Sequence, residues 1–227
     1  MKVGFLSGTS IVRSALFDAW ARRMVATPFG TIEVREQDGV ILLNRHGPAG
    51  LPPHAINHRA NLQALADLGC RDVVAVCSVG SLQPELAPGT VLVCSDYVSF
   101  RPATLTDVDF RALAPGVANN LVPRIVGALP YPVPTDKVYV QTPGPRFETK
   151  AEIRILRGWG DVVGMTAAAE ADLCGELGLN YNLLCIVDNF ANGAGGPPLS
   201  PESFRELVKA NQERVDDLFR RLLTLFA

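Results

Sequence analysis

The sequence predicts an α/β fold, a single domain over residues 1–227 in which helices cover both faces of a central sheet. The chain has 227 residues, of which 48% are apolar and 19% charged, and this suits one large domain with a continuous core. Short apolar runs alternate with helical patterns along the whole chain. Several runs are too uniformly apolar for a strand with one exposed face, so we expect them to be buried on both sides.

Seven apolar runs, bounded by Gly, Pro or polar residues, are predicted to be strands. In chain order they are Lys2–Leu6, Val40–Leu43, Val73–Cys77, Val91–Cys94, Val138–Gln141, Asp161–Gly164 and Tyr181–Val187. Thr31–Arg35 alternates apolar and polar residues, and Asp38-Gly39 is a typical hairpin turn. We therefore expect Thr31–Arg35 to pair with Val40–Leu43 as an outer strand.

Three segments have the periodicity and the end signals of helices. Ile56–Leu68 is followed by Gly69, and the alanine-rich Ala167–Leu177 is followed by Gly178. The third helix begins with Ser200 as cap and Pro201 at the first helical position. Its apolar stripe indicates core packing and comprises Phe204, Leu207, Val208, Val215, Leu218, Phe219 and Leu222. Pro102–Pro134 contains many prolines and has weak periodicity, so we predict a loop there.

The composition argues against several classes of protein. With 23 acidic and 21 basic residues the formal charge is −2, and such a balance argues against nucleic acid as the main partner. No apolar run approaches the ~20 residues needed to cross a bilayer, and the first residues are too glycine-interrupted for a signal peptide. The five cysteines include no CxxC pair, so we expect neither a metal site nor a disulfide. A cytoplasmic protein is the prediction.

Small and basic residues follow several predicted strands, where ligands usually bind in an open α/β sheet. Ser7-Gly8-Thr9-Ser10 places backbone N–H groups and hydroxyls where an anion can sit, although a tight turn explains the same residues. Arg45-His46 sets a permanent cation beside a titratable donor, which suits phosphate. Cys77-Ser78 ends a buried strand with small residues. Thr166 either caps the next helix or donates its hydroxyl to an anion.

Two further segments carry groups that can bind a flat heterocycle. Gly144 to Thr149 combines a rigid turn, the aromatic face of Phe147 and the carboxylate of Glu148 at the entry to a helix. Phe147 is equally typical of core packing. Asp188-Asn189 ends the last predicted strand, and a carboxylate and an amide there can read the edge of a heterocycle.

In this order the segments resemble the trimeric purine nucleoside phosphorylase and methylthioadenosine phosphorylase family. The resemblance runs from Val3 to about Asn192. Its most specific parts are Arg45-His46-Gly47, Pro52 to Leu68, Gly144 to Glu152, and Gly164-Met165-Thr166 with Glu170. It implies an α/β/α sandwich around a central mixed sheet, a homotrimer, and a pentosyltransferase that uses inorganic phosphate as co-substrate and needs no metal or organic cofactor.

The resemblance also implies a role for each candidate residue. The phosphate would be bound by Thr9, Arg45, His46, the backbone at Cys77-Ser78, and Thr166. Met165 would underlie the ribose, Phe147 would stack on the purine, Glu148 would bind its N1–H edge, and Asp188 or Asn189 would serve N7 and the 6-substituent. The implied reaction is phosphorolysis of the N-glycosidic bond, giving a free base and ribose 1-phosphate or its 5-methylthio analogue. The implied catalytic residues are His46 and Asp188, and Asp188 can donate to N7 only when protonated.

The base preference follows partly from the chemistry of Glu148. A carboxylate accepts from the N1–H of a 6-oxopurine, whereas adenine N1 has no hydrogen, so Glu148 favours 6-oxopurines. Asp188 resembles the adenine-type pattern and Asn189 the inosine type, so a methylthioadenosine phosphorylase is the alternative.

The chain departs from the family pattern in three places, and these keep other classes of protein open. Pro48-Ala49-Gly50 replaces a further histidine, His58 replaces a tyrosine, and Phe100–Pro134 is short where the family walls a neighbouring subunit's site. A non-catalytic purine-binding homologue is therefore a second hypothesis. A hydrolytic nucleosidase is a third, although Arg45, His46 and Thr166 argue for an anion in place of water.

Overall fold

The computed structural model describes residues 2–8, 11, 14–109, 113–195, 206, 209 and 211–226. Nine strands form one sheet in the order β2-β3-β4-β1-β5-β8-β7-β6-β9, and β9 also pairs with β5. Their bounds are β1 (Lys2–Ser7), β2 (Ala21–Thr27), β3 (Gly30–Gln37), β4 (Val40–Asn44), β5 (Cys70–Ser81), β6 (Val91–Val98), β7 (Lys137–Gln141), β8 (Val162–Gly164) and β9 (Asn180–Phe190). The predicted α/β fold with a mixed sheet is confirmed.

The sheet contains two sets of parallel strands. One set is β4, β1, β5 and β9, and the other is β6, β7 and β8. The two sets meet through the antiparallel pairs β5–β8 and β6–β9. At the other edge, β2, β3 and β4 form an antiparallel meander, with Asp38 and Gly39 at positive φ in the turn between β3 and β4. The predicted hairpin is thus confirmed.

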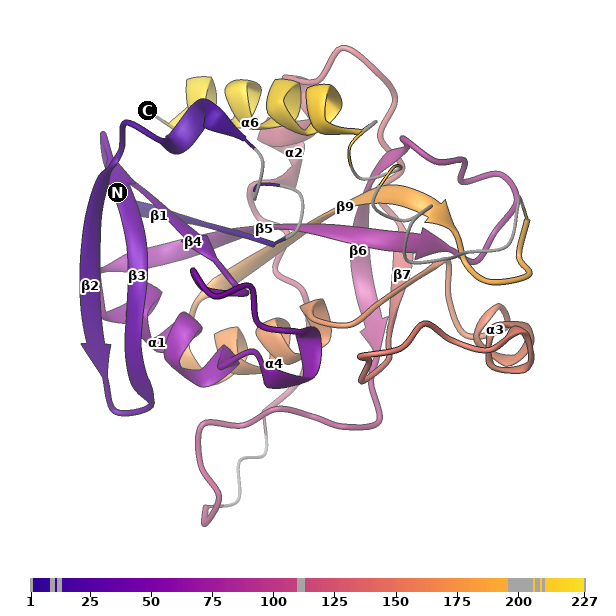
Figure 1. The fold of residues 1–227 in the computed structure, drawn as a ribbon, viewed down its shortest axis with the longest axis horizontal. Helices are drawn as coiled ribbons and strands as arrows, with labels where there is room; N and C mark the ends of the chain where they lie inside the picture. Colours follow the sequence, from indigo (N-terminus) through magenta and orange to yellow (C-terminus); the bar gives the residue numbers. More distant parts are fainter. Residues whose placement is uncertain are drawn as a thin grey trace.

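Helices cover both faces of the sheet (Figure 1). One face carries α1 (His58–Asp67) and α4 (Ala167–Leu177), and the other carries α2 (Val122–Gly127) and α6 (Gln212–Phe226). α3 (Lys150–Leu156) lies at the opposite end of the molecule from β2 and β3, and it packs with β7 and β8. Two 3₁₀ helices, η2 (Ala15–Phe17) and η3 (Pro53–Ala55), occupy connections.

Strand β5 shows how the sheet separates two cores. Its residues Val73, Ala75 and Cys77 pack in the cluster that includes α1 and α4. The intervening Val74 and Val76 pack with α2 and α6. This alternation of a continuous apolar run is what burial on both faces requires.

Most of the predicted elements are present, and the differences have physical reasons. β2 was not predicted, because Val25 is its only buried residue and the strand lies at the sheet edge. The prediction of a loop over Pro102–Pro134 is wrong at Val122–Gly127, which forms α2 with Pro123 in its first turn, where proline is tolerated. Ser200, Pro201, Phe204, Leu207 and Val208 of the predicted last helix lie outside the described residues.

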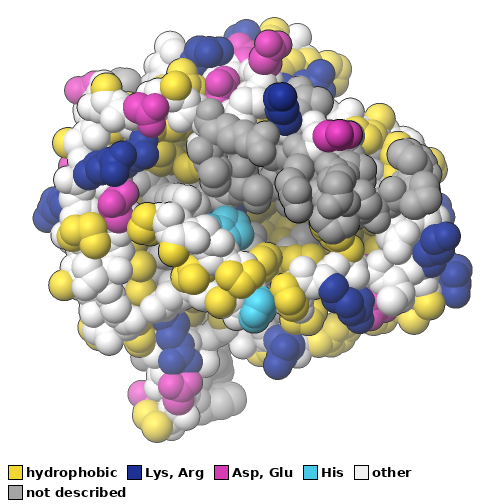
Figure 2. Space-filling view, in the orientation of Figure 1, with side chains coloured by type: hydrophobic (Ala, Val, Ile, Leu, Met, Phe, Trp, Pro, Cys, Tyr) yellow, Lys and Arg dark blue, Asp and Glu magenta, His cyan; other side chains and the backbone are white. Residues whose placement is uncertain are grey.

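The surface agrees with the balanced charge of the chain. On the face shown in Figure 2, Lys and Arg side chains are interspersed with Asp and Glu side chains, and two histidines are bordered by hydrophobic side chains. None of the helices within the described ranges is long and apolar enough to span a membrane.

Candidate active site

A cavity of about 480 Å³ lies where the ends of β4, β5, β8 and β9 come together. Polar and charged side chains on its wall are Arg45, His46, Ser78, Glu148, Thr166, Asn189 and Asn192. The apolar part of the wall includes Leu51, Val79, Phe147, Val163 and Met165. Segments as far apart in the chain as Arg45 and Asn192 thus contribute to one site.

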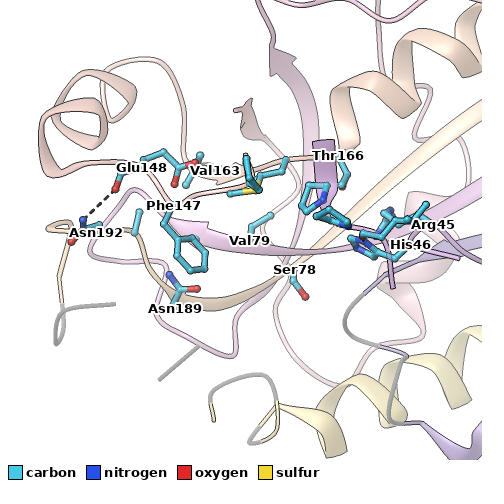
Figure 3. A pocket seen from close by; sticks show the side chains of 18 of the residues that line it. Arg45, His46, Ser78, Val79, Phe147, Glu148, Val163, Thr166, Asn189 and Asn192 are labelled. Carbon is cyan, nitrogen blue, oxygen red and sulfur yellow. Dashed lines mark hydrogen bonds between the residues drawn. The ribbon is translucent and has the colours of Figure 1, made fainter. Parts of the chain in front are cut away.

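The polar groups separate into two ends (Figure 3). Arg45 and His46 lie at one end with Thr166 near them, whereas Phe147, Glu148, Asn189 and Asn192 lie at the other. Ser78 and Val79 lie between the two ends. The cavity therefore offers one end with a guanidinium, an imidazole and a hydroxyl, and an aromatic end with a carboxylate and amides.

Arg45 is held almost entirely by the protein around it. Its side chain is 4% exposed and forms a bidentate ion pair with the fully buried Glu170, with Nε–Oε1 at 2.6 Å and Nη2–Oε2 at 3.2 Å. The guanidinium also donates to the carbonyls of Leu6 and Val76. Tyr181 donates its hydroxyl to Glu170 Oε2 at 2.7 Å. The sequence indicated Glu170 only as part of a motif. Its ion pair with Arg45 could not be predicted, because the two residues lie 125 apart in the chain.

Gly8 brings the first strand against Arg45 and His46. A Cβ on Gly8 would lie 2.8 Å from His46 Nε2 and 2.9 Å from Arg45 Nη1, closer than real contacts allow. The two nitrogens therefore pack against the Gly8 backbone more closely than any side chain at that position would allow, and both residues line the cavity. Thr9, predicted to bind phosphate beside Gly8, lies outside the described residues.

The hydroxyl of Thr166 makes no side-chain capping hydrogen bond to α4. Two side chains of β7 cap that helix: the Tyr139 hydroxyl accepts from the N–H groups of Thr166 and Ala167, and Gln141 Oε1 accepts from Ala168 and Ala169. The helix therefore does not need the Thr166 hydroxyl, and Thr166 lines the cavity, with the buried Cys77 Sγ 3.9 Å from its Oγ1.

Cys77 and Ser78 differ in position. Cys77 is 1% exposed and its sulfur lies against Arg45 Nη2 at 3.3 Å, so the residue does not line the cavity, whereas Ser78 does. This is the alternation of β5, in which neighbouring side chains point to opposite faces. The backbone role predicted for Cys77 stays a prediction.

Glu148 is 7% exposed at the aromatic end of the cavity. The Thr142 hydroxyl donates to its Oε1 at 2.5 Å, and Asn192 donates to its backbone carbonyl at 3.2 Å. These contacts fix the carboxylate beside Phe147. Met165 also lines the cavity and packs over Gly144, where a Cβ would lie 2.6 Å from its sulfur.

A β-bulge on β9 separates the roles of Asp188 and Asn189. The register with β5 runs from Val79–Val187 to Gly80–Asn189, which leaves Asp188 as the extra residue. Asn189 lines the cavity, whereas Asp188 is 2% exposed, does not line it, and accepts from Asn211 at 3.0 Å near the start of α6. Burial raises the pKa of Asp188, and the hydrogen bonds from Asn211 and Ser78 act against that rise.

The chain is similar to known proteins over almost its whole length. The sequence model of the phosphorylase superfamily matches residues 20–224. A probable 6-oxopurine nucleoside phosphorylase of Archaeoglobus fulgidus is 35% identical, over 96% of this chain and 93% of that protein. A probable S-methyl-5′-thioinosine phosphorylase of Methanocaldococcus jannaschii is also 35% identical, over 94% of this chain and 88% of that protein. Among solved structures, methylthioadenosine phosphorylase from Schistosoma mansoni in complex with adenine matches with a TM-score of 0.86 at 25% identity, over 99% of this chain and 91% of that one.

Proposed function

The chain belongs to the phosphorylase superfamily as a purine nucleoside phosphorylase, and we propose that it prefers 6-oxopurine nucleosides or their 5′-methylthio analogues. The observation that carries this preference is the carboxylate of Glu148, fixed by Thr142 beside Phe147 in the same cavity as Arg45, His46 and Thr166. Phosphate at the Arg45 end and purine at the Phe147 end would place the glycosidic bond between them.

The proposed mechanism follows from this order of groups. Phosphate held by Arg45, His46, Thr166 and the backbone at Cys77-Ser78 lies beneath the ribose and attacks C1′ as the glycosidic bond breaks. The transition state has oxocarbenium character, so the phosphate charge stabilises it. Met165 supports the ribose. The products are the free base and ribose 1-phosphate or 5-methylthioribose 1-phosphate, and we propose that no metal or organic cofactor takes part.

We assign the contact with purine N7 to Asn189. The purine leaves with negative charge, and a hydrogen bond to N7 relieves it. One N–H of the Asn189 amide donates to the Phe190 carbonyl at 2.8 Å, which orients the amide and leaves its second N–H for the ligand. Asp188 does not reach the cavity. It would orient Ser78 by a hydrogen bond, so its role in catalysis is that of a positioning residue.

Two finer proposals concern the protein's state in the cell. A homotrimer is proposed from the family resemblance, with residues 1–227 as one domain in each subunit. A cytoplasmic location is supported by the five cysteines, all of which are buried free thiols, as expected in a reducing compartment.

The deciding assay measures base release from inosine, guanosine, adenosine, methylthioadenosine and methylthioinosine, each with and without phosphate. We expect phosphate-dependent release, fastest with a 6-oxopurine substrate. Release without phosphate would favour a nucleosidase, and no release from any substrate would favour a binding protein. A preference for methylthioadenosine would support the alternative, S-methyl-5′-thioadenosine phosphorylase.

Glu148→Gln tests the base preference directly. A hydrogen bond to a charged group contributes about 1.5–3 kcal/mol, so we expect kcat/KM for inosine to fall about 10- to 100-fold while that for adenosine is unchanged or higher. Glu85→Gln, at an exposed glutamate outside the cavity wall, is the control. An equal loss for both nucleosides would contradict the role given to Glu148.

A further inference from the structure

Arg45 brings little net charge to the anion end of the cavity. It is the only Lys or Arg on the described part of the wall, and Glu170 occupies two of its nitrogens at 2.6 and 3.2 Å. The carboxylate is itself held by Tyr181 in full burial. A buried, hydrogen-bonded pair of this kind is close to neutral seen from outside, so the anion must be held largely by hydrogen bonds.

The hydrogen bond to Leu51 fixes the tautomer of His46. Nδ1 lies 2.7 Å from the Leu51 carbonyl oxygen. A carbonyl only accepts, so Nδ1 must carry the proton. In the neutral ring Nε2 is then an acceptor. Nε2 and Arg45 Nη1 both lie within 3 Å of where a Cβ on Gly8 would be, so the two atoms are neighbours at one end of the cavity that both residues line. A fully ionised oxyanion bound there would meet a lone pair at Nε2.

The groups around His46 keep its ring neutral. Burial lowers its pKa from the usual value, the Arg45 charge lowers it further, and the Leu51 carbonyl and Glu170 act in the opposite direction. From α1, His58 faces the same cluster with Nδ1 3.8 Å from Glu170 Oε1, and burial lowers the pKa of that ring too. Neither histidine therefore supplies a standing positive charge near neutral pH.

We propose that this site selects an oxyanion that carries its own proton. Hydrogenphosphate donates its P–OH to Nε2 of His46 and accepts from Arg45 Nη1 and the Thr166 hydroxyl. Sulfate has no proton to donate near neutral pH, so it binds only when His46 takes up one proton from the solvent. The inference rests on the proposed phosphate co-substrate, and it makes His46 the residue that separates phosphate from sulfate.

The test is the affinity of the intact protein for phosphate and for sulfate by calorimetry, from about pH 8, where imidazole is neutral, to about pH 5. For sulfate, log Kd should rise with pH at a slope near one, because one proton is bound with each ion. For phosphate the slope should stay near zero above about pH 7.5, since imidazole is neutral there and hydrogenphosphate is already the main form of the free ion. Titration in two buffers of different ionisation enthalpy should show uptake of about one proton with sulfate and none with phosphate, as linkage requires.

His46→Gln gives an independent measurement. An amide can turn its NH₂ toward the anion, so phosphate and sulfate affinities at about pH 8, where imidazole is neutral, should come within about threefold of each other. His54→Gln, at an exposed histidine off the cavity wall, should keep the selectivity and slope of the wild type.

Sulfate binding with a pH-independent Kd, or no sulfate binding even at about pH 5, where a free imidazole is protonated, would overturn the inference. That result together with phosphate-dependent base release leaves the proposed function standing. Absence of both phosphate binding and phosphate-dependent release would instead remove the proposed function.

Discussion

Gly8 is required by space and not by conformation. Its φ is not in the left-handed region, yet a Cβ would lie within 3 Å of both His46 Nε2 and Arg45 Nη1. The site therefore depends on the absence of a side chain at the end of β1. A glycine that is needed only because a side chain would clash cannot be distinguished from other glycines in a single sequence.

Gly8→Ala should raise the KM for phosphate by about tenfold or more, since one lost charge-assisted hydrogen bond already amounts to about 1.5–3 kcal/mol. The KM for the nucleoside should change little, because its base is bound at the other end of the cavity. Steady-state kinetics with phosphate varied will show this. Gly127→Ala, where a Cβ meets nothing within 4 Å, is the matched control and should behave as wild type. A larger rise in the KM for nucleoside than in the KM for phosphate would contradict the placement of phosphate beside Arg45 and His46.

The Asp188→Asn variant should gain stability relative to wild type as pH rises. The native pKa of Asp188 is raised by burial, so the wild-type stability linked to this group is fully present below the unfolded pKa of about 3.9 and is lost as pH rises through the native value. The free energy of unfolding of the variant minus that of wild type, measured with denaturant, should grow from about pH 4 to about pH 8. A free carboxyl is partly ionised at the first pH and fully ionised at the second.

Asp136→Asn provides the control for this pH series, because the Asp136 side chain is 83% exposed. Its difference from wild type should be small at every pH. A constant difference for Asp188→Asn across the series would show that burial does not raise the pKa of this carboxyl.

Helix α4 depends on β7 for its N-terminal cap, which links an element of the fold to the site. Tyr139 and Gln141 together accept from the backbone N–H of the N-cap Thr166 and from the first three N–H groups of the helix. They satisfy donors that the helix leaves free and so release the Thr166 hydroxyl for the cavity.

Tyr139→Phe should lower the free energy of unfolding by about 1–3 kcal/mol, because two buried N–H groups lose their acceptor. Denaturant unfolding will measure the loss. Tyr131→Phe is the matched control: its hydroxyl is buried without a partner among the described residues, so its removal should be nearly neutral. Equal effects of the two substitutions would refute the capping role of Tyr139.

The elements that were predicted correctly are those whose pattern is set by burial on both faces, such as β5 with its run from Val73 to Cys77. β2 could not be predicted, because this edge strand contains Arg22 and Arg23 and lacks the alternation of apolar and polar residues that indicates a strand. In the site, local segments predicted that Arg45, His46, Glu148 and Thr166 lie together, and all four line the cavity. Which of Asp188 and Asn189 lines it could not be predicted, because this depends on a bulge in the pairing with β5.

At the scale of the whole molecule, the cavity lies where the two parallel sets of strands meet. β5 pairs with β9 in parallel and with β8 antiparallel, so loops from both sets reach the same place.

A second hollow of about 390 Å³ lies beside the cavity and shares Glu148 with it. Its rim carries exposed apolar side chains, with Phe100 74%, Ile155 57% and Trp159 45% exposed. Apolar exposure of this size next to a site is typical of a protein interface.

Phe100→Asp should weaken the proposed homotrimer. Phe100 stacks edge-on against Trp159 at 5.2 Å between ring centroids, and a carboxylate there would be desolvated by a second subunit. Wild-type protein should sediment at about three times the chain mass of 24.4 kDa, and the variant should shift toward the single-chain mass on dilution. Because the second hollow shares Glu148 with the catalytic cavity, activity should fall with dilution in parallel. Met24→Asp, at an exposed methionine on β2, should change neither measurement. A variant that stays trimeric at every concentration would place the subunit interface elsewhere on the molecule.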